Sequence, residues 1–334
     1  MKVAVFSTKK YDETFLSKVN KEYGHELLFL ETSLGPKTVT LAQGARGVCV
    51  FVNDKIDKEV IDCLLEENVE MIALRNAGFN NVNVAYALEK GIKIFRVPAY
   101  SPHAVAEHAV ALILTLNRKT HKAYNRVRES NFSLEKLLGF DLNGKTVGVI
   151  GTGKIGAAFC SVIKGFGTRV IAFDKYESDQ LKAEGVEYMN LDQLFSESDI
   201  ISLHCPLTPE THHIINDNSV ENMKDGVMII NTSRGALIDT KSVIRGLKRQ
   251  KIAYLGIDVY EQEESLFFQD LSETVIQDDE ISRLMSFPNV LITAHQAFFT
   301  ENALSQIAHT TLKNITDFEA GNDNGNMVTE KDIK

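Results

Sequence analysis

The stretch KTVGVIGTGKIGAAF, residues 145–159, decides how this chain folds. An apolar, β-prone run leads into Gly151, Gly153 and Gly156, spaced as G-x-G-x-x-G, and a helix-prone run follows. Gly151 permits a tight turn, Gly153 lets the backbone approach a pyrophosphate, and Gly156 lets helix and strand pack closely. The positive end of the helix dipole favours the same pyrophosphate. The stretch therefore predicts a strand–turn–helix unit that binds a dinucleotide.

The next strand-like run, RVIAFD, ends at Asp174. An acidic side chain at this place can accept hydrogen bonds from the adenosine ribose. The same carboxylate would repel a 2′-phosphate, an effect that the adjacent Lys175 softens slightly. We therefore expect NAD(H) rather than NADP(H) as the cofactor.

Strand-like and helix-like runs alternate along the chain, which is typical of parallel α/β sheets. Before the fingerprint, strands are predicted at 2–7, 25–31, 47–52, 70–75 and 92–97, with a helix at 57–68. After it begins, strands are predicted at 145–150, 168–173, 199–204, 227–231, 252–258 and 289–294. Only the second series carries the glycine-rich turn. We therefore predict two Rossmann-like or flavodoxin-like open parallel-sheet domains, with the active site in the cleft between them.

A long helix is predicted at residues 101–130, which open with a serine and Pro102 and contain no later proline or glycine. From Ala104 to Leu116 this segment is apolar on nearly every face, so we expect a domain or subunit contact to bury it on more than one side. A final helix is predicted at about 300–320. Residues 322–334 are interpreted as a solvated tail.

Composition narrows the function further. The 334 residues are 44% hydrophobic and 24% charged, and the formal net charge of −9 argues against a nucleic-acid-binding surface. The longest apolar runs are much shorter than the roughly 20 residues that span a membrane. The beginning of the chain does not fit a secretory signal. The four cysteines lack metal-ligand spacing, so we expect reduced thiols in a cytoplasmic protein and no metal site.

Three predicted strands after the fingerprint end near residues that carry chemistry: Arg234, the acidic stretch from Asp258 to Glu264, and His295. Ligands of open α/β sheets bind beyond the carboxyl ends of the strands. Arginine can bind a carboxylate through two parallel hydrogen bonds. Histidine can exchange a proton with a carbonyl or hydroxyl oxygen. A nearby carboxylate would orient the imidazole. With a nicotinamide, this set suits hydride transfer to a 2-keto acid.

Spacing alone does not choose among Glu261, Glu263 and Glu264 as the partner of His295. The other eight histidines are interpreted as structural: His25, His103, His108, His121, His204, His212, His213 and His309.

Over nearly its whole length the chain resembles the D-isomer-specific 2-hydroxyacid dehydrogenases. The resemblance is carried, in order, by RNAGFNNVN, YSPHAVAEHAVAL, GKTVGVIGTGKIG, HCPLTPETHHIIN, NTSRGALIDT, GIDVYEQEE and NVLITAHQAFFTENAL. TLNRKTHKAYNRVRESNFSLEKLLGF and HQAFFTENAL look most like the fermentative D-lactate dehydrogenase branch. This resemblance implies NADH-dependent, reversible reduction of pyruvate to D-lactate.

The resemblance also implies roles for individual residues. Arg234 would bind the substrate carboxylate, His295 would be the acid/base, and Glu263 would pair with His295. The backbone N–H groups of Ala77 and Gly78, with Tyr100 nearby, would complete the carboxylate site. The aromatic residues Tyr100, Phe298 and Phe299 themselves suggest a tight pocket that favours a small substrate. Positions matching cofactor contacts are Lys154, Ile155, Asp174, Cys205, Pro206, Thr211, Thr232, Ser233 and Asp258. Cys205 stands where valine is common.

The family further implies a discontinuous substrate domain, 1–100 plus 300–334, around an NAD-binding domain, 101–299. Members usually pair through the cofactor domain, so we expect a homo-oligomer, at least a dimer, with its contact on the helix at 101–130.

Three alternative functions stay open. The first is a dehydrogenase of the same family for a larger keto acid such as 2-ketoisocaproate. The second is a non-catalytic NADH-sensing corepressor, and the third is a methyltransferase. The set Arg234, Glu263 and His295 argues against the last two.

Overall fold

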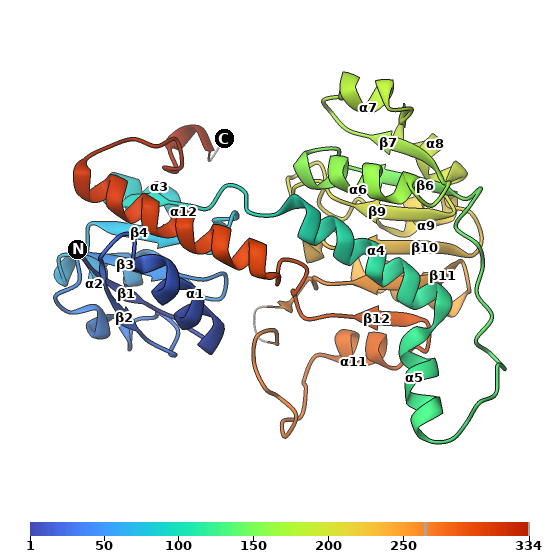
Figure 1. The fold of residues 1–334 in the computed structure, drawn as a ribbon, viewed down its shortest axis with the longest axis horizontal. Coiled ribbons are helices and arrows are strands. Elements are labelled where there is room, and N and C mark those ends of the chain that lie inside the picture. Colours follow the sequence, from blue (N-terminus) through green and yellow to red (C-terminus); the bar gives the residue numbers. More distant parts are fainter. Residues whose placement is uncertain (264–265, 333–334) are drawn as a thin grey trace. The chain divides into compact units, whose positions relative to one another are not determined.

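The computed structural model describes residues 1–263 and 266–332, and the chain divides into two compact units. Met1–Ser101 and Phe299–Lys334 form the first unit, and Pro102–Phe298 forms the second. Each unit is an open parallel β-sheet with helices on both faces (Figure 1), which confirms the predicted fold class. Within the described residues, no helix combines the length and apolar character needed to cross a membrane.

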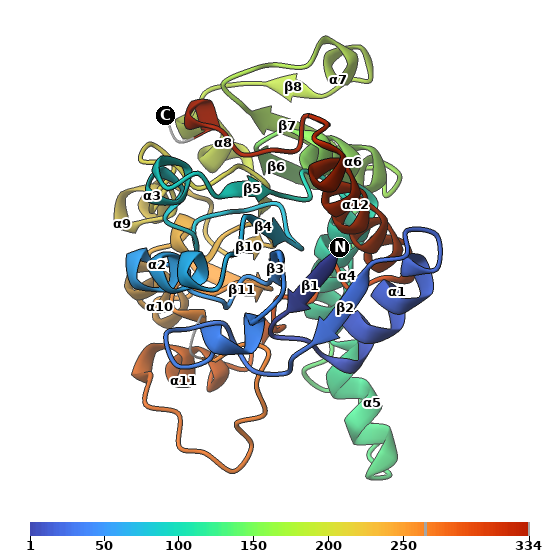
Figure 2. The ribbon, with the colours of Figure 1, turned by 90° about the vertical axis from the view of Figure 1, so that its left-hand side faces the viewer.

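The sheet of the first unit has the order β2-β1-β3-β4-β5, with all neighbours parallel. One face packs on α1 and α12, and the other packs on α2 and α3 (Figure 2). Both faces of β3 and β4 are buried, which explains why these strands are apolar at consecutive positions. The elements are β1 (Lys2–Val5), α1 (Lys10–Asn20), β2 (Glu26–Phe29), β3 (Gly47–Val50), α2 (Lys58–Glu66), β4 (Met71–Leu74), α3 (Val84–Glu89), β5 (Lys93–Phe95) and α12 (Glu301–Ala320).

The segment after α12 is not a solvated tail, so that prediction was wrong for residues 326–328. Val328 is fully buried, and its N–H donates to the Ile94 carbonyl at 2.8 Å. Met327 forms an antiparallel bridge to Phe95 beside the edge strand β5. So short a pairing has no periodicity for a sequence pattern to reveal. Residues 333–334 of the predicted tail lie outside the described part.

The sheet of the second unit has the order β12-β11-β10-β9-β6-β7-β8, again entirely parallel. Helices α4 and α6 pack on one face, and α8, α9 and α10 pack on the other. The elements are α4 (Pro102–Arg118), α5 (Thr120–Arg128), β6 (Thr146–Ile150), α6 (Lys154–Lys164), β7 (Arg169–Phe173), α7 (Asp179–Ala183), β8 (Glu187–Tyr188), α8 (Leu191–Glu197), β9 (Ile200–Leu203), α9 (Asp217–Asn222), β10 (Val227–Asn231), α10 (Thr240–Lys248), β11 (Ile252–Ile257), α11 (Asp279–Met285) and β12 (Val290–Ile292).

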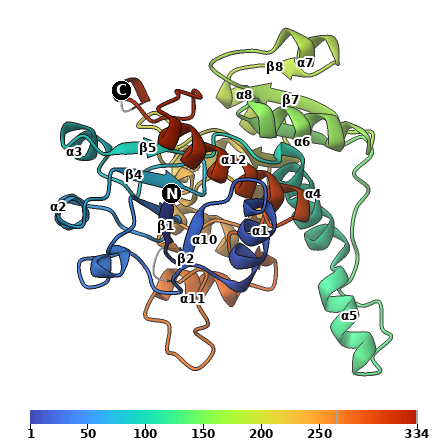
Figure 3. The ribbon, with the colours of Figure 1, turned by 60° about the vertical axis from the view of Figure 1, so that its left-hand side comes forward.

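The single helix predicted at 101–130 is two helices, α4 and α5, so that prediction was wrong. Lys119 separates them with φ at +52°, in the left-handed region that ends a right-handed helix. No glycine or proline marks this position in the sequence. The apolar α4 is buried within its own unit, against α6, β10 and β11. In contrast, no residue of α5 is buried, and α5 points away from the sheet of its unit (Figure 3).

Val328→Asp tests the packing of the C-terminal segment. Placing a carboxylate at this buried position should lower the free energy of unfolding by roughly 3 kcal/mol or more, because the charge loses its hydration. Chemical denaturation measures the change. The matched control is Val275→Asp, because Val275 is 78% exposed. Equal stability of the two variants would contradict the buried position of Val328.

Candidate active site

The strand order of the second unit gathers the predicted site residues at one edge. β10, β11 and β12 are parallel neighbours, so the segments that follow them leave the same edge of the sheet. Arg234, Asp258 and His295 lie in these segments. The strand order reverses between β6 and β9, and such switch points are where open α/β sheets bind ligands. The glycine-rich turn follows β6 at this point.

The glycine-rich turn fits a dinucleotide. Gly151 has φ at +93°, and a Cβ there would lie 2.4 Å from the Cys205 backbone nitrogen. A Cβ on Gly156 would lie 1.9 Å from the Gly151 carbonyl oxygen, so helix and strand require glycine to pack this closely. Gly153 begins α6 without a side-chain cap, and nothing lies within 4 Å of a Cβ placed on it. The first turn of α6 can therefore present its N–H groups to a pyrophosphate.

The neighbouring positions agree with this assignment. Asp174 follows β7, and its carboxylate accepts hydrogen bonds from the N–H groups of Thr152 and Tyr176. The Thr232 hydroxyl, after β10, is buried without a hydrogen-bond partner among the described residues. A buried hydroxyl without a partner is costly, and a ligand that bonds to it would remove this cost.

The remaining cofactor positions lie in three places. Lys154 and Ile155 begin α6, and Cys205, Pro206 and Thr211 lie on the loop after β9. The Ser233 hydroxyl donates to the Cys205 carbonyl at 2.7 Å, which joins the loops after β9 and β10.

No group of three His, Cys, Asp or Glu side chains in residues 1–263 and 266–332 is arranged to hold a metal ion.

Glu263 and His295 form a direct pair. Nδ1 of His295 lies 2.7 Å from Oε1 of Glu263, and the other carboxylate oxygen accepts from the Tyr260 N–H at 2.8 Å. Both side chains are largely buried, with 21% of His295 and 23% of Glu263 exposed. Glu261 instead contacts His213, and Glu264 lies outside the described residues. Since Nδ1 is occupied by the carboxylate, Nε2 is the ring nitrogen left for a substrate.

The backbone of His295 is strained, and Asp258 holds it. His295 has φ at +53°, which costs about 1–3 kcal/mol in a residue other than glycine. Its N–H donates to the Asp258 carbonyl at 2.7 Å. The Asp258 carboxylate accepts from the N–H groups of Gln296 and Ala297 and from the Thr293 hydroxyl. One fully buried side chain thus fixes the segment that presents His295.

His108, interpreted as structural from the sequence, supports this segment. Its Nε2 lies 3.1 Å from the Thr293 hydroxyl and 3.5 Å from the Asp258 carboxylate. Burial raises the pKa of Asp258, but the hydrogen bonds from His108, Thr293 and the backbone outweigh it, so the pKa lies below its ordinary value of 3.8. His108 is on α4, far from Asp258 in sequence, and no local motif indicates the contact.

Arg234 lies after β10, just before the short 3-10 helix η2 (Gly235–Leu237). Asn231 fixes this turn, because its side-chain amide donates to the Arg234 carbonyl at 2.8 Å. One guanidinium N–H donates to the Ser233 carbonyl at 2.7 Å. In the part of the chain that the structure describes, no carboxylate forms an ion pair with Arg234. Its guanidinium can therefore serve an anionic ligand.

The predicted residues of the first unit lie after β4 and β5. The Asn76 side chain donates to the Gly78 carbonyl at 2.6 Å, and Arg96 donates to the Ala77 carbonyl at 3.4 Å. Among the described residues, no acceptor bonds to the N–H of Ala77 or Gly78. Tyr100 is partly exposed.

The two phenylalanines fall in different units. Phe298 ends the second unit and is buried, at 8% exposed. Phe299 begins the C-terminal part of the first unit and packs edge-on against Tyr11, with ring centroids 4.8 Å apart.

Asp258→Asn should destabilise the protein by roughly 2–4 kcal/mol at neutral pH, because the amide brings an N–H donor against donors that bonded to a carboxylate. A carboxyl group whose pKa is lowered by folding stabilises above its ordinary pKa and loses this effect as pH falls through the folded value. The difference from wild type, measured by denaturation between pH 7 and pH 3, should therefore shrink below about pH 4. Asp179→Asn, at a side chain 99% exposed, is the control. A difference independent of pH would contradict the charge of Asp258.

Known proteins resemble this chain over almost its whole length. The family model for the D-isomer specific 2-hydroxyacid dehydrogenase NAD binding domain matches residues 110–297. The chain is 56% identical to D-lactate dehydrogenase of Escherichia coli (strain K12) over 321 residues, 96% of this chain and 98% of that protein. The apo structure of the Escherichia coli D-lactate dehydrogenase aligns with a TM-score of 0.91 and 52% identity, over 98% of this chain and 100% of that one. The pyruvate reductase structure of Chlamydomonas reinhardtii aligns with a TM-score of 0.94 and 42% identity, over 98% of each chain. With its dinucleotide turn and Glu263–His295 pair, this chain therefore belongs to the NAD-dependent D-isomer-specific 2-hydroxyacid dehydrogenases.

Proposed function

We propose that this protein catalyses the reversible, NADH-dependent reduction of pyruvate to D-lactate. The similar proteins named above include a D-lactate dehydrogenase and a pyruvate reductase, each aligned over nearly its whole length. The observation that carries the proposal is the Glu263–His295 pair, at the same sheet edge as Arg234. A cytoplasmic location, where NADH turns over, is part of the same proposal.

His295 acts as the general acid. Glu263 accepts the hydrogen bond from Nδ1–H, so Nε2 faces the substrate and donates a proton to the keto oxygen. The Glu263 carboxylate keeps the imidazole oriented so that Nε2 is the proton donor. When bound, NADH supplies the hydride for the keto carbon. In the reverse direction, neutral His295 removes the proton from the lactate hydroxyl.

Arg234 binds the substrate carboxylate. A planar guanidinium matches both oxygens of a carboxylate, and this geometry orients the keto group for reaction. We assign further carboxylate contacts to the N–H groups of Ala77 and Gly78 and to Tyr100. Phe298 is the residue we assign to limiting the size of the substrate side chain.

The direct test follows NADH absorbance with pyruvate, 2-ketoisocaproate, oxaloacetate and glyoxylate, with chiral analysis of each product. The highest kcat/KM is expected with pyruvate, and the product should be the D isomer. No turnover with any of the four keto acids would reject the dehydrogenase function. A preference for 2-ketoisocaproate would reject only the assignment of pyruvate.

His295→Gln should lower kcat for pyruvate by about 10²-fold or more, because glutamine cannot supply the proton. Steady-state kinetics measure kcat, and fluorescence titration should give an NADH dissociation constant close to that of wild type. Near-normal turnover would reject His295 as the acid.

Arg234→Lys is the matched comparison at the same edge of the sheet. Lysine keeps the charge but lacks the planar fork, so KM for pyruvate should rise more than kcat falls. An unchanged KM would contradict the assignment of Arg234 to the substrate carboxylate.

We also propose that the protein forms a dimer through its NAD-binding unit. Within the predicted contact region, 101–130, most apolar side chains of α4 are buried in its own unit. We therefore assign the contact to α5, in the same region, and to the segment after it, where Tyr124, Val127, Phe132, Leu134 and Leu138 are between 52% and 87% exposed. A second copy of this chain would cover these side chains, since exposed apolar patches mark contact surfaces.

The double variant Leu134→Glu/Leu138→Glu should shift the molar mass in solution from dimer to monomer, because carboxylates oppose burial of this surface. Sedimentation velocity measures the mass. Leu41→Glu is the control, because Leu41 is 45% exposed in the first unit. A monomeric wild type, or a double variant of unchanged mass, would contradict the proposed contact.

A further inference from the structure

The Tyr260–Glu261 peptide lies between the two halves of the proposed catalytic set. A Cβ placed on Gly235 would lie 2.1 Å from the Tyr260 carbonyl carbon and 2.4 Å from the Glu261 nitrogen. The backbone of the turn that follows Arg234 therefore packs directly against the backbone of this peptide. The adjacent peptide, Val259–Tyr260, donates its N–H to Glu263, which contacts His295. Tyr260 belongs to both peptides, so a shift of the backbone at Tyr260 would move Arg234 relative to the Glu263–His295 pair.

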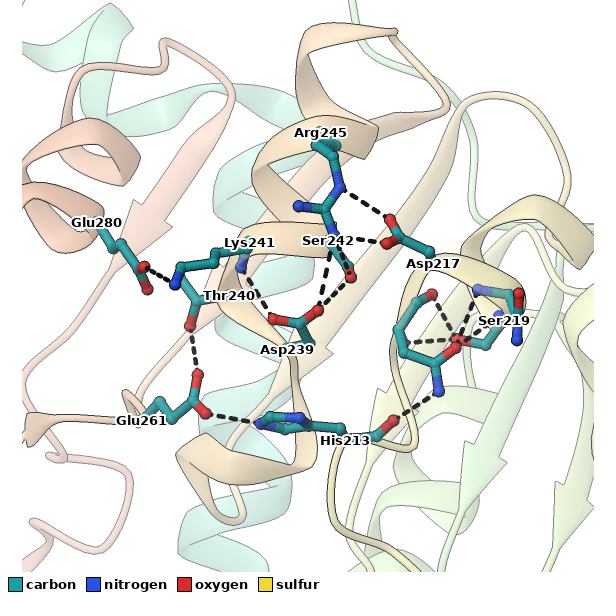
Figure 4. A network of polar contacts seen from close by, with 12 residues as sticks. His213, Asp217, Ser219, Asp239, Thr240, Lys241, Ser242, Arg245, Glu261 and Glu280 are labelled. Atoms are coloured by element: carbon teal, nitrogen blue, oxygen red, sulfur yellow. Dashed lines mark hydrogen bonds and ion pairs between the residues drawn. The ribbon is translucent and has the colours of Figure 1, made fainter.

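A second histidine–glutamate pair holds this peptide. Nε2 of His213 lies 2.6 Å from Oε1 of Glu261, and Oε2 of Glu261 accepts from the Thr240 hydroxyl at 3.0 Å (Figure 4). The side chains are 32% and 24% exposed, so their contact is partly shielded from water. Both oxygens of Glu261 are thereby bonded to residues of two other segments, the loop after β9 and the start of α10.

His213 also holds the arginine turn directly. Its N–H donates to the Ala236 carbonyl at 2.9 Å, within η2, which follows Arg234. The His213 backbone has φ at +51°, a conformation that persists only when its surroundings impose it. The Asn216 side chain supplies one such constraint by donating to the His213 carbonyl at 2.8 Å. His213 thus bonds to the arginine turn through its backbone and to Glu261 through its ring.

We propose that His213 and Glu261 are positioning residues for the reaction. Their contact clamps the 260–261 peptide against Gly235 and so keeps Arg234 and the Glu263–His295 pair at the spacing that the keto acid requires. They act through Gly235 and Tyr260, not on the substrate itself. The inference rests on the proposed pyruvate reduction and adds to it a second histidine–glutamate pair, which contacts the backbone between Arg234 and Glu263.

The test uses His213→Asn, Glu261→Ala and the double variant in the full chain. Asparagine is chosen because it tolerates the left-handed conformation better than most residues. Each single variant should lower kcat for pyruvate by about 10-fold or more, because small displacements of reacting groups have large effects on rate. The primary isotope effect with 4-deuterated NADH should rise as hydride transfer becomes slower. NADH affinity, measured by fluorescence, should stay within about twofold.

The double variant shows whether the two residues act as one unit. If they do, its kcat should lie within about twofold of the lower single variant, because the second substitution removes a contact already lost. Glu261→Gln keeps the shape and one acceptor oxygen, so its loss should be smaller than that of Glu261→Ala. It also carries the test if His213→Asn fails to fold.

Lys241→Met is the matched control. Lys241 lies on α10 in the same network and pairs with Glu280 at 3.4 Å, without a bond to Glu261 (Figure 4). Its kcat should stay within about twofold of wild type.

Three results would overturn the positioning role: normal kcat and isotope effect in both single variants, losses that multiply in the double variant, or an equal loss in Lys241→Met. Wild type is assayed beside each variant. Wild type that is inactive on every keto acid rejects the proposed function and the positioning role together, whereas active wild type beside unaffected variants rejects the positioning role alone.

Discussion

The parallel direction of the seven strands in the second unit is the constraint on which the site depends. Because all strands point the same way, every segment that follows a strand begins at one edge. Arg234, Asp258 and His295 come from consecutive positions along that edge, after β10, β11 and β12. The reversal between β6 and β9 opens the same edge to a dinucleotide. Helices cover both faces of the sheet, so the edge at the carboxyl ends of the strands is the part of the sheet where a ligand can bind.

The buried carboxylate of Asp258 fixes the backbone that presents His295. Asp258 is fully buried, and its carboxylate is stabilised by hydrogen bonds from the segment that it holds. Those bonds offset the backbone strain of His295, whose imidazole contacts Glu263. His213 and Glu261 form a second histidine–carboxylate pair, which we propose positions the residues of the site rather than contacting the substrate. Histidine–carboxylate pairs thus appear both at the proposed acid and in its support.

Local pattern was sufficient for much of the fold and failed at identifiable places. Strands such as β3 and β10 are buried on both faces, so their continuous apolar runs were readable. The break at Lys119 was not, because a lysine in the left-handed region leaves no composition signal. Val328 pairs with β5 through too few residues to show periodicity. Each failure concerns a conformation imposed by surroundings that are distant in sequence.

The sequence by itself determined the dinucleotide turn and the preference for NAD(H), because local spacing encodes both. It also offered Arg234 and His295 as candidates, because each follows a predicted strand. Spacing alone left the partner of His295 open and the family resemblance pointed to Glu263; the tertiary structure places Glu263, and not Glu261, against His295. It also brought His108 against Thr293 and Asp258, and His213 against Glu261. These contacts join segments separated by long stretches of chain, and the sheet order that joins them is a property of the folded molecule.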